Sequence, residues 1–174
     1  TTEYGFSYRV DDHGSIMEEA SFIDVNSALI NEGNIEQNSD VDFFEFTTNE
    51  TGTIALLIQP DILAANLDIE AKLFDSSGTV ISTSNPATKL HAEFDITLNA
   101  GTFYLSVEGT GYDDPESEGY SDYASLGYYS ITSLSPFSCS QGCFSFDIDL
   151  DEKLEADALT DGLLVIRHLF GFSG

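Results

Sequence analysis

The sequence predicts an all-β fold, a jelly-roll-like antiparallel β-sandwich of about seven or eight strands, followed by a short acidic loop and a helix. Three observations predict it. Short segments alternate apolar and polar residues with the period of two that half-buried strands show. Turn signals that end in glycine separate these segments. Helical periodicity is absent before residue 135 and present after it.

The clearest predicted strand is 90–98, whose five apolar residues share one face. The same pattern predicts strands over 41–47, 53–59, 67–74, 79–83, 102–107 and 128–134. Predicted turns follow at 49–52, 75–78 and 99–101, and each ends in a glycine that can adopt a positive φ. Two packed sheets would bury the apolar face of every one of these strands.

The chain separates into three regions. We interpret residues 1–20 as a linker from an upstream domain, 21–134 as the sandwich and 135–174 as an acidic loop plus helix. The helix is predicted from apolar residues at spacings of three and four, namely Leu159, Leu163, Ile166 and Phe170. About ten residues do not form a stable helix alone, so we expect it to dock on the sandwich, a metal loop or a second copy. The start at Thr1, without a signal peptide, indicates an excised piece of a longer chain.

Composition limits the possible functions. Of 174 residues, 41% are hydrophobic, which is enough for one ordinary sandwich. The 31 Asp and Glu residues outnumber 5 Lys and Arg, a net charge of −26, so no basic patch can contact nucleic acid or an anionic membrane. No apolar run approaches the length that crosses a bilayer. Divalent cations such as Ca²⁺ would offset the charge, and the alternative is a solvated acidic surface suited to a salty medium.

The only cysteines are Cys139 and Cys143, which lack the CxxC spacing of redox enzymes. We expect a local disulfide between them, which indicates an oxidising compartment. Its five-residue loop would constrain little chain entropy, so it would pin a turn instead of holding the fold together.

The strongest motif is a run of acids at alternate positions leading into the terminal helix. Carboxylates spaced in this way gather oxygens around one Ca²⁺ ion in loop-type sites. The candidate ligands are Asp147, Asp149, Asp151, Glu155, Asp157 and Asp161, with Lys153 offering its carbonyl. Glu152 stands where such loops have glycine, and Ala158 where they have an acid. The alternative is a solvated acidic turn that caps the helix.

A second group of candidate metal ligands lies upstream. Asp11 and Asp12 in the lead-in could fold back onto the sandwich, and Asp40 and Asp42, at the start of a predicted strand, are candidate partners. Paired acids in a linker are more often solvated, so spacing alone leaves both interpretations open.

A loop rich in glycine and tyrosine spans 109–129, which is long for a compact domain. Tyrosine combines a flat ring with a polar tip and suits the binding of sugars or extended peptides. The candidate ligand-binding residues are Tyr112, Tyr120, Tyr123 and Tyr128. The alternative, that these rings pack the loop against the sandwich, is equally open.

No catalytic arrangement is visible in the sequence. His13, His91 and His168 fall in three different regions, and no zinc-protease, nucleophile-elbow or phosphate-loop motif occurs. Carboxylates are abundant, yet nothing selects one pair for acid–base chemistry. The sequence therefore predicts a chain that is not an enzyme.

Short sequence blocks follow one another in a specific order over residues 10–134. They are DDHG (11–14), GNIE (33–36), SDVDFF (39–44), NLDI (66–69), LFDSSG (73–78), AGTFYL (100–105) and GYSDYASLG (119–127). Together they resemble the bacterial pre-peptidase C-terminal (PPC) domain, which follows the catalytic domain of secreted metalloproteases and serine proteases.

The resemblance implies a small antiparallel sandwich related to the collagen-binding domains of clostridial collagenases. It implies a non-catalytic role, either in secretion or maturation or in holding the protease on an insoluble substrate. It also implies Ca²⁺ between the lead-in and the sandwich, which would make Asp11, Asp12, Asp40 and Asp42 ligands. The tail 146–171 resembles dockerin-like or thrombospondin-type-3-like calcium repeats, but a single repeat does not support cohesin binding.

We therefore expect a secreted, extracellular, calcium-binding accessory region of a bacterial peptidase. Its expected partners are the upstream peptidase domain of the same chain and an insoluble, collagen-like protein. The alternative is a carbohydrate-binding sandwich of a secreted polysaccharide-degrading enzyme, whose partner would be a polysaccharide.

Overall fold

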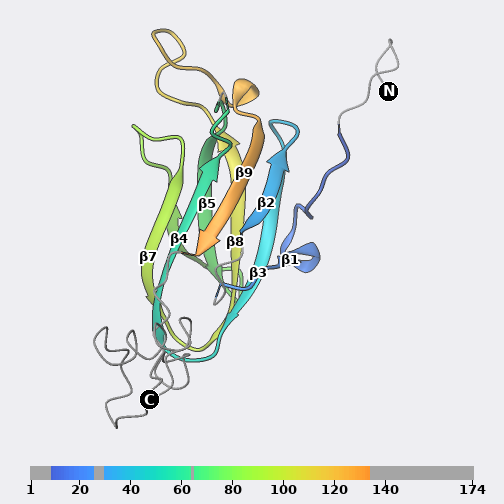
Figure 1. Cartoon of the computed structure of the whole chain (residues 1–174), viewed down its shortest axis with the longest axis vertical. Coiled ribbons are helices and arrows are strands. Elements are labelled where there is room, and N and C mark those ends of the chain that lie inside the picture. The colour runs from blue at the N-terminus through green and yellow to red at the C-terminus, as the bar shows by residue number, and fades with distance from the viewer. Residues whose placement is uncertain (1–8, 26–29, 64, 134–174) are drawn as a thin grey trace, which may run out of the picture. The chain divides into compact units, whose positions relative to one another are not determined.

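The computed structural model describes residues 9–25, 30–63 and 65–133 (Figure 1). The chain divides into two compact units, Thr1–Pro136 and Phe137–Gly174, and all described residues belong to the first. The predicted tail metal loop, the Cys139 and Cys143 pair and the terminal helix therefore lie outside the described residues.

Nine strands form two sheets in the described part of the chain. The strands are β1 Ser21–Phe22, β2 Asn31–Ile35, β3 Val41–Thr48, β4 Gly52–Pro60, β5 Asp68–Asp75, β6 Val80–Ser84, β7 Ala92–Leu98, β8 Gly101–Thr110 and β9 Gly127–Ser133. One sheet has the order β1-β3-β8-β5-β6 and the other β2-β9-β4-β7. Every neighbouring pair is antiparallel except β1 with β3. Two 3₁₀ turns, η1 Met17–Glu19 and η2 Asp122–Ala124, complete the described elements, and the predicted all-β sandwich is confirmed.

Strict alternation along the strands builds the core between the sheets. On β3, Phe44 and Phe46 are fully buried, whereas the intervening Glu45 is half-buried. Buried residues of the other sheet, such as Leu56, Ile58 and Ile131, belong to the same apolar cluster. Asp42 has the same register on β3 as the two phenylalanines, so its carboxylate also enters the interior.

The lead-in is attached to the sandwich instead of leaving it freely. The backbone N–H of Phe43 donates to the Gly14 carbonyl at 3.0 Å. His13 packs on Phe44 with ring centroids 4.6 Å apart, and its Nε2 lies 2.9 Å from the Glu32 carbonyl oxygen. These contacts bring the residues just before His13 against β2 and β3. Within the described ranges, no helix is long and apolar enough to span a membrane.

Candidate metal centre

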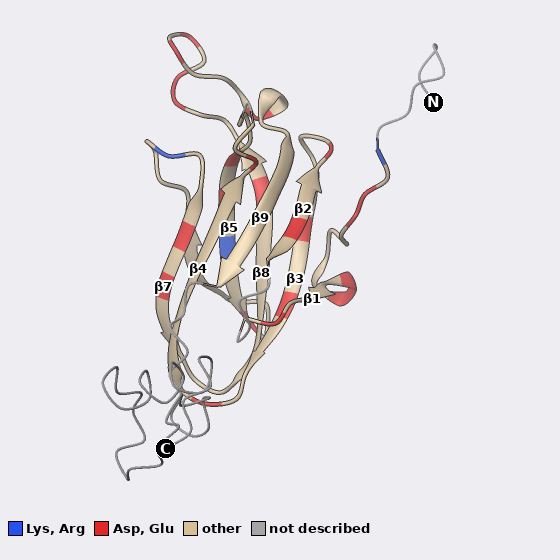
Figure 2. Ribbon diagram, viewed as in Figure 1, with Lys and Arg blue, Asp and Glu red and all other residues tan. Residues whose placement is uncertain are grey.

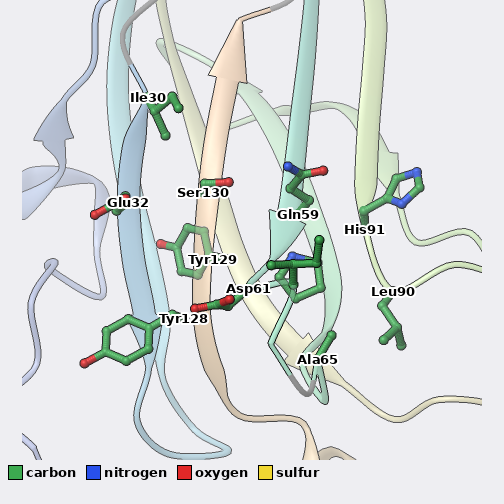
Figure 3. A pocket seen from close by; sticks show the side chains of 12 residues that line it. Ile30, Glu32, Gln59, Asp61, Ala65, Leu90, His91, Tyr128, Tyr129 and Ser130 are labelled. Carbon is green, nitrogen blue, oxygen red and sulfur yellow. The ribbon is translucent and has the colours of Figure 1, made fainter.

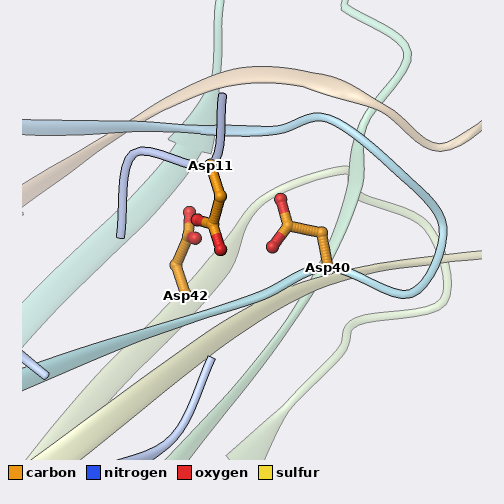
Figure 4. A group of neighbouring side chains, drawn as sticks. All are labelled: Asp11, Asp40 and Asp42. Atoms are coloured by element: carbon orange, nitrogen blue, oxygen red, sulfur yellow. The ribbon is translucent and has the colours of Figure 1, made fainter. Parts of the chain in front are cut away.

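Three carboxylates from separate segments meet beside β3. Asp11 comes from the lead-in, Asp40 from the turn before β3 and Asp42 from the strand itself, and one carboxylate oxygen of each lies within 4.8 Å of the others (Figure 4). Asp11 also groups with Asp12 and Glu36 within the same limit. The structure thus brings together the four upstream acids that the sequence nominated and adds Glu36. We call these five residues the acid cluster.

Local hydrogen bonds position the cluster. The Glu36 N–H donates to Asp40 Oδ2 at 3.0 Å, and the Asp40 N–H donates to the Gln37 carbonyl at 3.1 Å, which together fix the turn between β2 and β3. Asn34 Nδ2 donates to Glu36 Oε1 at 2.7 Å. In the lead-in, the His13 N–H donates to Asp11 Oδ1 at 3.1 Å. These bonds hold Asp11, Glu36 and Asp40 in place beside one another.

Asp42 is the buried member of the cluster, with 0% of its surface exposed. Its Oδ2 accepts a 2.5 Å hydrogen bond from the Tyr129 hydroxyl, whereas its Oδ1 has no hydrogen-bond partner among the described residues. The carboxyl groups of Asp11, Asp40 and Asp42 point toward one another (Figure 4). Glu36 Oε2 is likewise buried without a partner in the described part. Buried charged oxygens without a partner are costly, and a cation held among these carboxylates would supply one.

Tyr129 orients Asp42 from the opposite sheet. The ring is 2% exposed on β9 and packs edge-on against Phe44, at a centroid distance of 6.4 Å. Gly33 on β2 makes room for it, since a Cβ there would lie 2.3 Å from the Tyr129 hydroxyl oxygen. The small residue and the tyrosine therefore together hold Asp42 Oδ2, while Oδ1 has no hydrogen-bond partner among the described residues.

The electrostatics of the cluster show uncompensated negative charge. Burial raises the pKa of Asp42 to about 8, and the charges of Asp40, Asp12 and Asp11 add to the shift, against the Tyr129 hydrogen bond. Burial followed by the Glu36 side chain raises the pKa of Asp40 to about 6, and burial also raises the pKa of Asp12. Among the described residues, no Lys or Arg forms an ion pair with these carboxylates, and basic side chains are sparse throughout (Figure 2). A divalent cation at this place would lower all of these pKa values.

The four candidate tyrosines lie in different environments in the structure. Tyr112 and Tyr120 stack on each other at 5.9 Å, and the Tyr120 hydroxyl donates to the Asn66 carbonyl at 2.8 Å, so this pair packs the loop. Tyr123 is 74% exposed, and Tyr128, 50% exposed, lines a groove on the outer face of the four-stranded sheet (Figure 3). Only Tyr128 therefore lies at a concave surface of the described residues.

Two contributors to the site were not identified from sequence. Glu36 belongs to the GNIE block that carries the family resemblance, so that block was the available signal. The sequence does not single out Tyr129. An inward-facing tyrosine in a strand is interpreted as a core residue until its partner on the opposite sheet, here Asp42, is known. The tail candidates, Asp147 to Asp161, lie outside the described residues and stay a prediction.

No protein-family model matches the chain. No curated protein matches it. Among solved structures, it is similar to the 1.0 Å crystal structure of the pre-peptidase C-terminal domain of a collagenase from Bacillus anthracis. The two share 18% identity with a TM-score of 0.49, over 66% of this chain and 94% of that one. Collagenase is the name of that protein and is not carried over to this chain.

Proposed function

We propose that this chain is a non-catalytic, calcium-binding accessory domain of a secreted bacterial peptidase, which aids secretion or maturation or anchors the enzyme on insoluble protein. The observation that carries the calcium part is Asp42, a fully buried carboxylate that has an unpartnered oxygen and groups with two other acids. The ordered PPC-like blocks in the sequence support the accessory role.

The donor set suits a hard cation. The acid cluster offers only oxygen atoms, which Ca²⁺ prefers, and contains no thiolate or imidazole among its members. Asp11, Asp40 and Asp42 would hold the ion. Asp12 and Glu36, which group with Asp11, would add negative charge next to it. When bound, the ion would neutralise the cluster and join the lead-in to β3. Because the unfolded chain cannot assemble these ligands, binding would stabilise the folded state by mass action.

Isothermal titration with CaCl₂, together with elemental analysis, tests this proposal on the full chain. Asp42→Asn should remove one binding event, whereas the matched control Glu116→Gln, at an exposed acid of the 109–126 loop, should bind as the wild type does. Asp149→Ala reports separately on the predicted tail site. Wild-type calcium binding by Asp42→Asn would refute the assignment of this centre.

One observation favours the carbohydrate-binding alternative. The half-exposed Tyr128 ring and the Gln59 amide line the same groove, and a sugar could use this combination of stacking surface and hydrogen-bonding amide. Pull-down of the chain on collagen and other insoluble proteins, against chitin, agar and cellulose, separates the two functions. Retention on polysaccharide alone would replace the peptidase-associated proposal with this one.

A further inference from the structure

A groove of about 720 Å³ lies on the outer face of the four-stranded sheet, and none of the five acids of the cluster is among its lining residues (Figure 3). Its floor is a cross-strand row formed by Glu32 on β2, Ser130 on β9 and Gln59 on β4, which are paired in register. These side chains alternate with buried core residues, so they point outward from the sandwich. The register of three strands therefore fixes the floor.

Aliphatic residues form the rim of this groove. Ile62 in the β4–β5 loop is 92% exposed, Leu63 beside it 81%, and Ile30 before β2 63%. Leu90 and Ala65 also line the groove. Adjacent apolar side chains exposed to this degree mark a contact surface, because water disfavours them and nothing in the described residues covers them.

Two carboxylates give the groove its charge. Glu32 and Asp61 line it together with His91, and no Lys or Arg is among its lining residues. Neither carboxylate forms an ion pair within the described ranges. The net charge of −26 reinforces the local potential, and the Arg9 guanidinium on the Tyr128 ring offsets one of these two carboxylates, so the groove favours a positive group over an acidic one.

The ring of Tyr128 also lines the groove, and Arg9 holds it in position. The Arg9 guanidinium lies 5.0 Å from the centroid of the Tyr128 ring, and Arg9 Nη1 donates to the Tyr128 hydroxyl. The ring is thus fixed in the free protein, which lowers the entropic cost of packing a ligand against it.

We propose that this groove binds an extended polypeptide segment that carries a lysine or arginine flanked by aliphatic side chains. The basic group would lie between Glu32 and Asp61, and its aliphatic neighbours would pack on Ile30, Ile62 and Leu90. Aliphatic walls with paired carboxylates suit such a segment better than a neutral sugar, which would use several aromatic faces. The inference deepens the proposed anchoring role and rests on it, but does not depend on the calcium centre.

The test uses the full chain in calcium at low ionic strength. The probe is a short fluorescein-labelled peptide with one lysine between valine and leucine residues, followed by fluorescence anisotropy. The double variant Glu32→Gln with Asp61→Asn should weaken binding by about fivefold or more, because both countercharges are lost. Replacing the probe lysine with norleucine should weaken it equally. Ile62→Ser should also reduce affinity.

The matched control is Glu116→Gln with Glu118→Gln, which removes the same charge from the exposed 109–126 loop. It should change affinity by less than about twofold. Equal weakening by both double variants would show general attraction to an acidic surface and overturn the proposal. Absence of probe binding, or displacement of the probe by chitohexaose, would overturn it as well. In that case the calcium titration of the Glu32→Gln, Asp61→Asn variant separates the two proposals. If this titration is unchanged, the calcium centre is retained and only the groove assignment has failed.

Discussion

At the scale of single residues, Asp42 occupies a core position while carrying an ionisable group. It shares the inward face of β3 with Phe44 and Phe46, and aspartate is almost never fully buried without a partner. Tyr129 satisfies one of its oxygens only. An Asn at this position would keep the shape of the side chain but lose its negative charge. Binding of a cation here would therefore depend on the carboxylate of Asp42.

The pKa of Asp42 predicts an unusual pH dependence for the calcium-free protein. Its folded pKa of about 8 lies above the ordinary value of 3.8, so the protonated form stabilises the fold. That stability is full below the ordinary pKa and is lost as pH rises through about 8. In EDTA, wild-type stability should fall between about pH 6.5 and 8, by at most about 1.4 kcal/mol per pH unit. Asp40, with a pKa of about 6, contributes mainly below this window.

Denaturant unfolding across this pH range measures the effect. Asp42→Asn should show a flatter profile in EDTA, because the titrating group is gone. In excess Ca²⁺ the wild type should also flatten, since the ion replaces the proton. Parallel profiles for wild type and variant in EDTA would contradict the assignment of the raised pKa to Asp42.

Tyr129→Phe tests the orientation of Asp42. The ring would keep its packing on Phe44, but Asp42 Oδ2 would lose its only hydrogen bond. Residues that orient metal ligands typically change affinity by about 10- to 100-fold when replaced. We expect weaker calcium binding by about that factor in calorimetry, with near-wild-type circular dichroism. Unchanged affinity would mean that Tyr129 serves the core alone.

At the scale of elements, strands with clean alternation were predictable from sequence and the others were not. Each of the seven predicted strands is present, with ends shifted by three residues or fewer. Strand β2 was missed because Asn31–Ile35 is polar, contains Gly33 and has three consecutive buried residues instead of alternation. Strand β1 has two residues and pairs in parallel with β3, which no local pattern reveals.

The same limit applies to the sites. The acid cluster joins residues about thirty positions apart, so the sequence nominated four of its five members and the lead-in contacts bring them together. The groove draws its lining from several strands and a loop, and depends on which strands neighbour β9. Strand order comes from long-range packing, and this is why the groove could not be predicted.

The 109–126 loop is tied to the sandwich through one serine. Ser125 is fully buried, its Oγ accepts from the Asp68 N–H at 2.7 Å and donates to the Asp68 carbonyl at 3.2 Å. Ser125→Ala should cost about 1–3 kcal/mol, because the Asp68 N–H loses its partner and the Asp68 carbonyl keeps the longer bond from Thr110 Oγ1, at 3.4 Å. Limited proteolysis should then cut the loop sooner, while the calcium titration stays unchanged. Equal protease resistance of variant and wild type would show that other contacts, such as the Tyr120 bond to Asn66, hold the loop.

At the scale of the whole molecule, bound calcium would offset the repulsion among the excess acids. A net charge of −26 opposes compaction, and the acid cluster concentrates five of those carboxyl groups in two groups of three that share Asp11. A bound cation would relieve this repulsion where it is most costly and would fasten the lead-in to β3. Folding stability and calcium should therefore be coupled throughout the sandwich.

The thermal melt of the full chain in CaCl₂ and in EDTA tests this claim most directly. We predict that chelation lowers the wild-type melting temperature by several degrees or more, since an ion bound only to the folded state stabilises it. Asp42→Asn should lose most of that difference, whereas Glu116→Gln should keep it. A melt that EDTA leaves unchanged, with no bound metal by elemental analysis, would contradict the calcium centre.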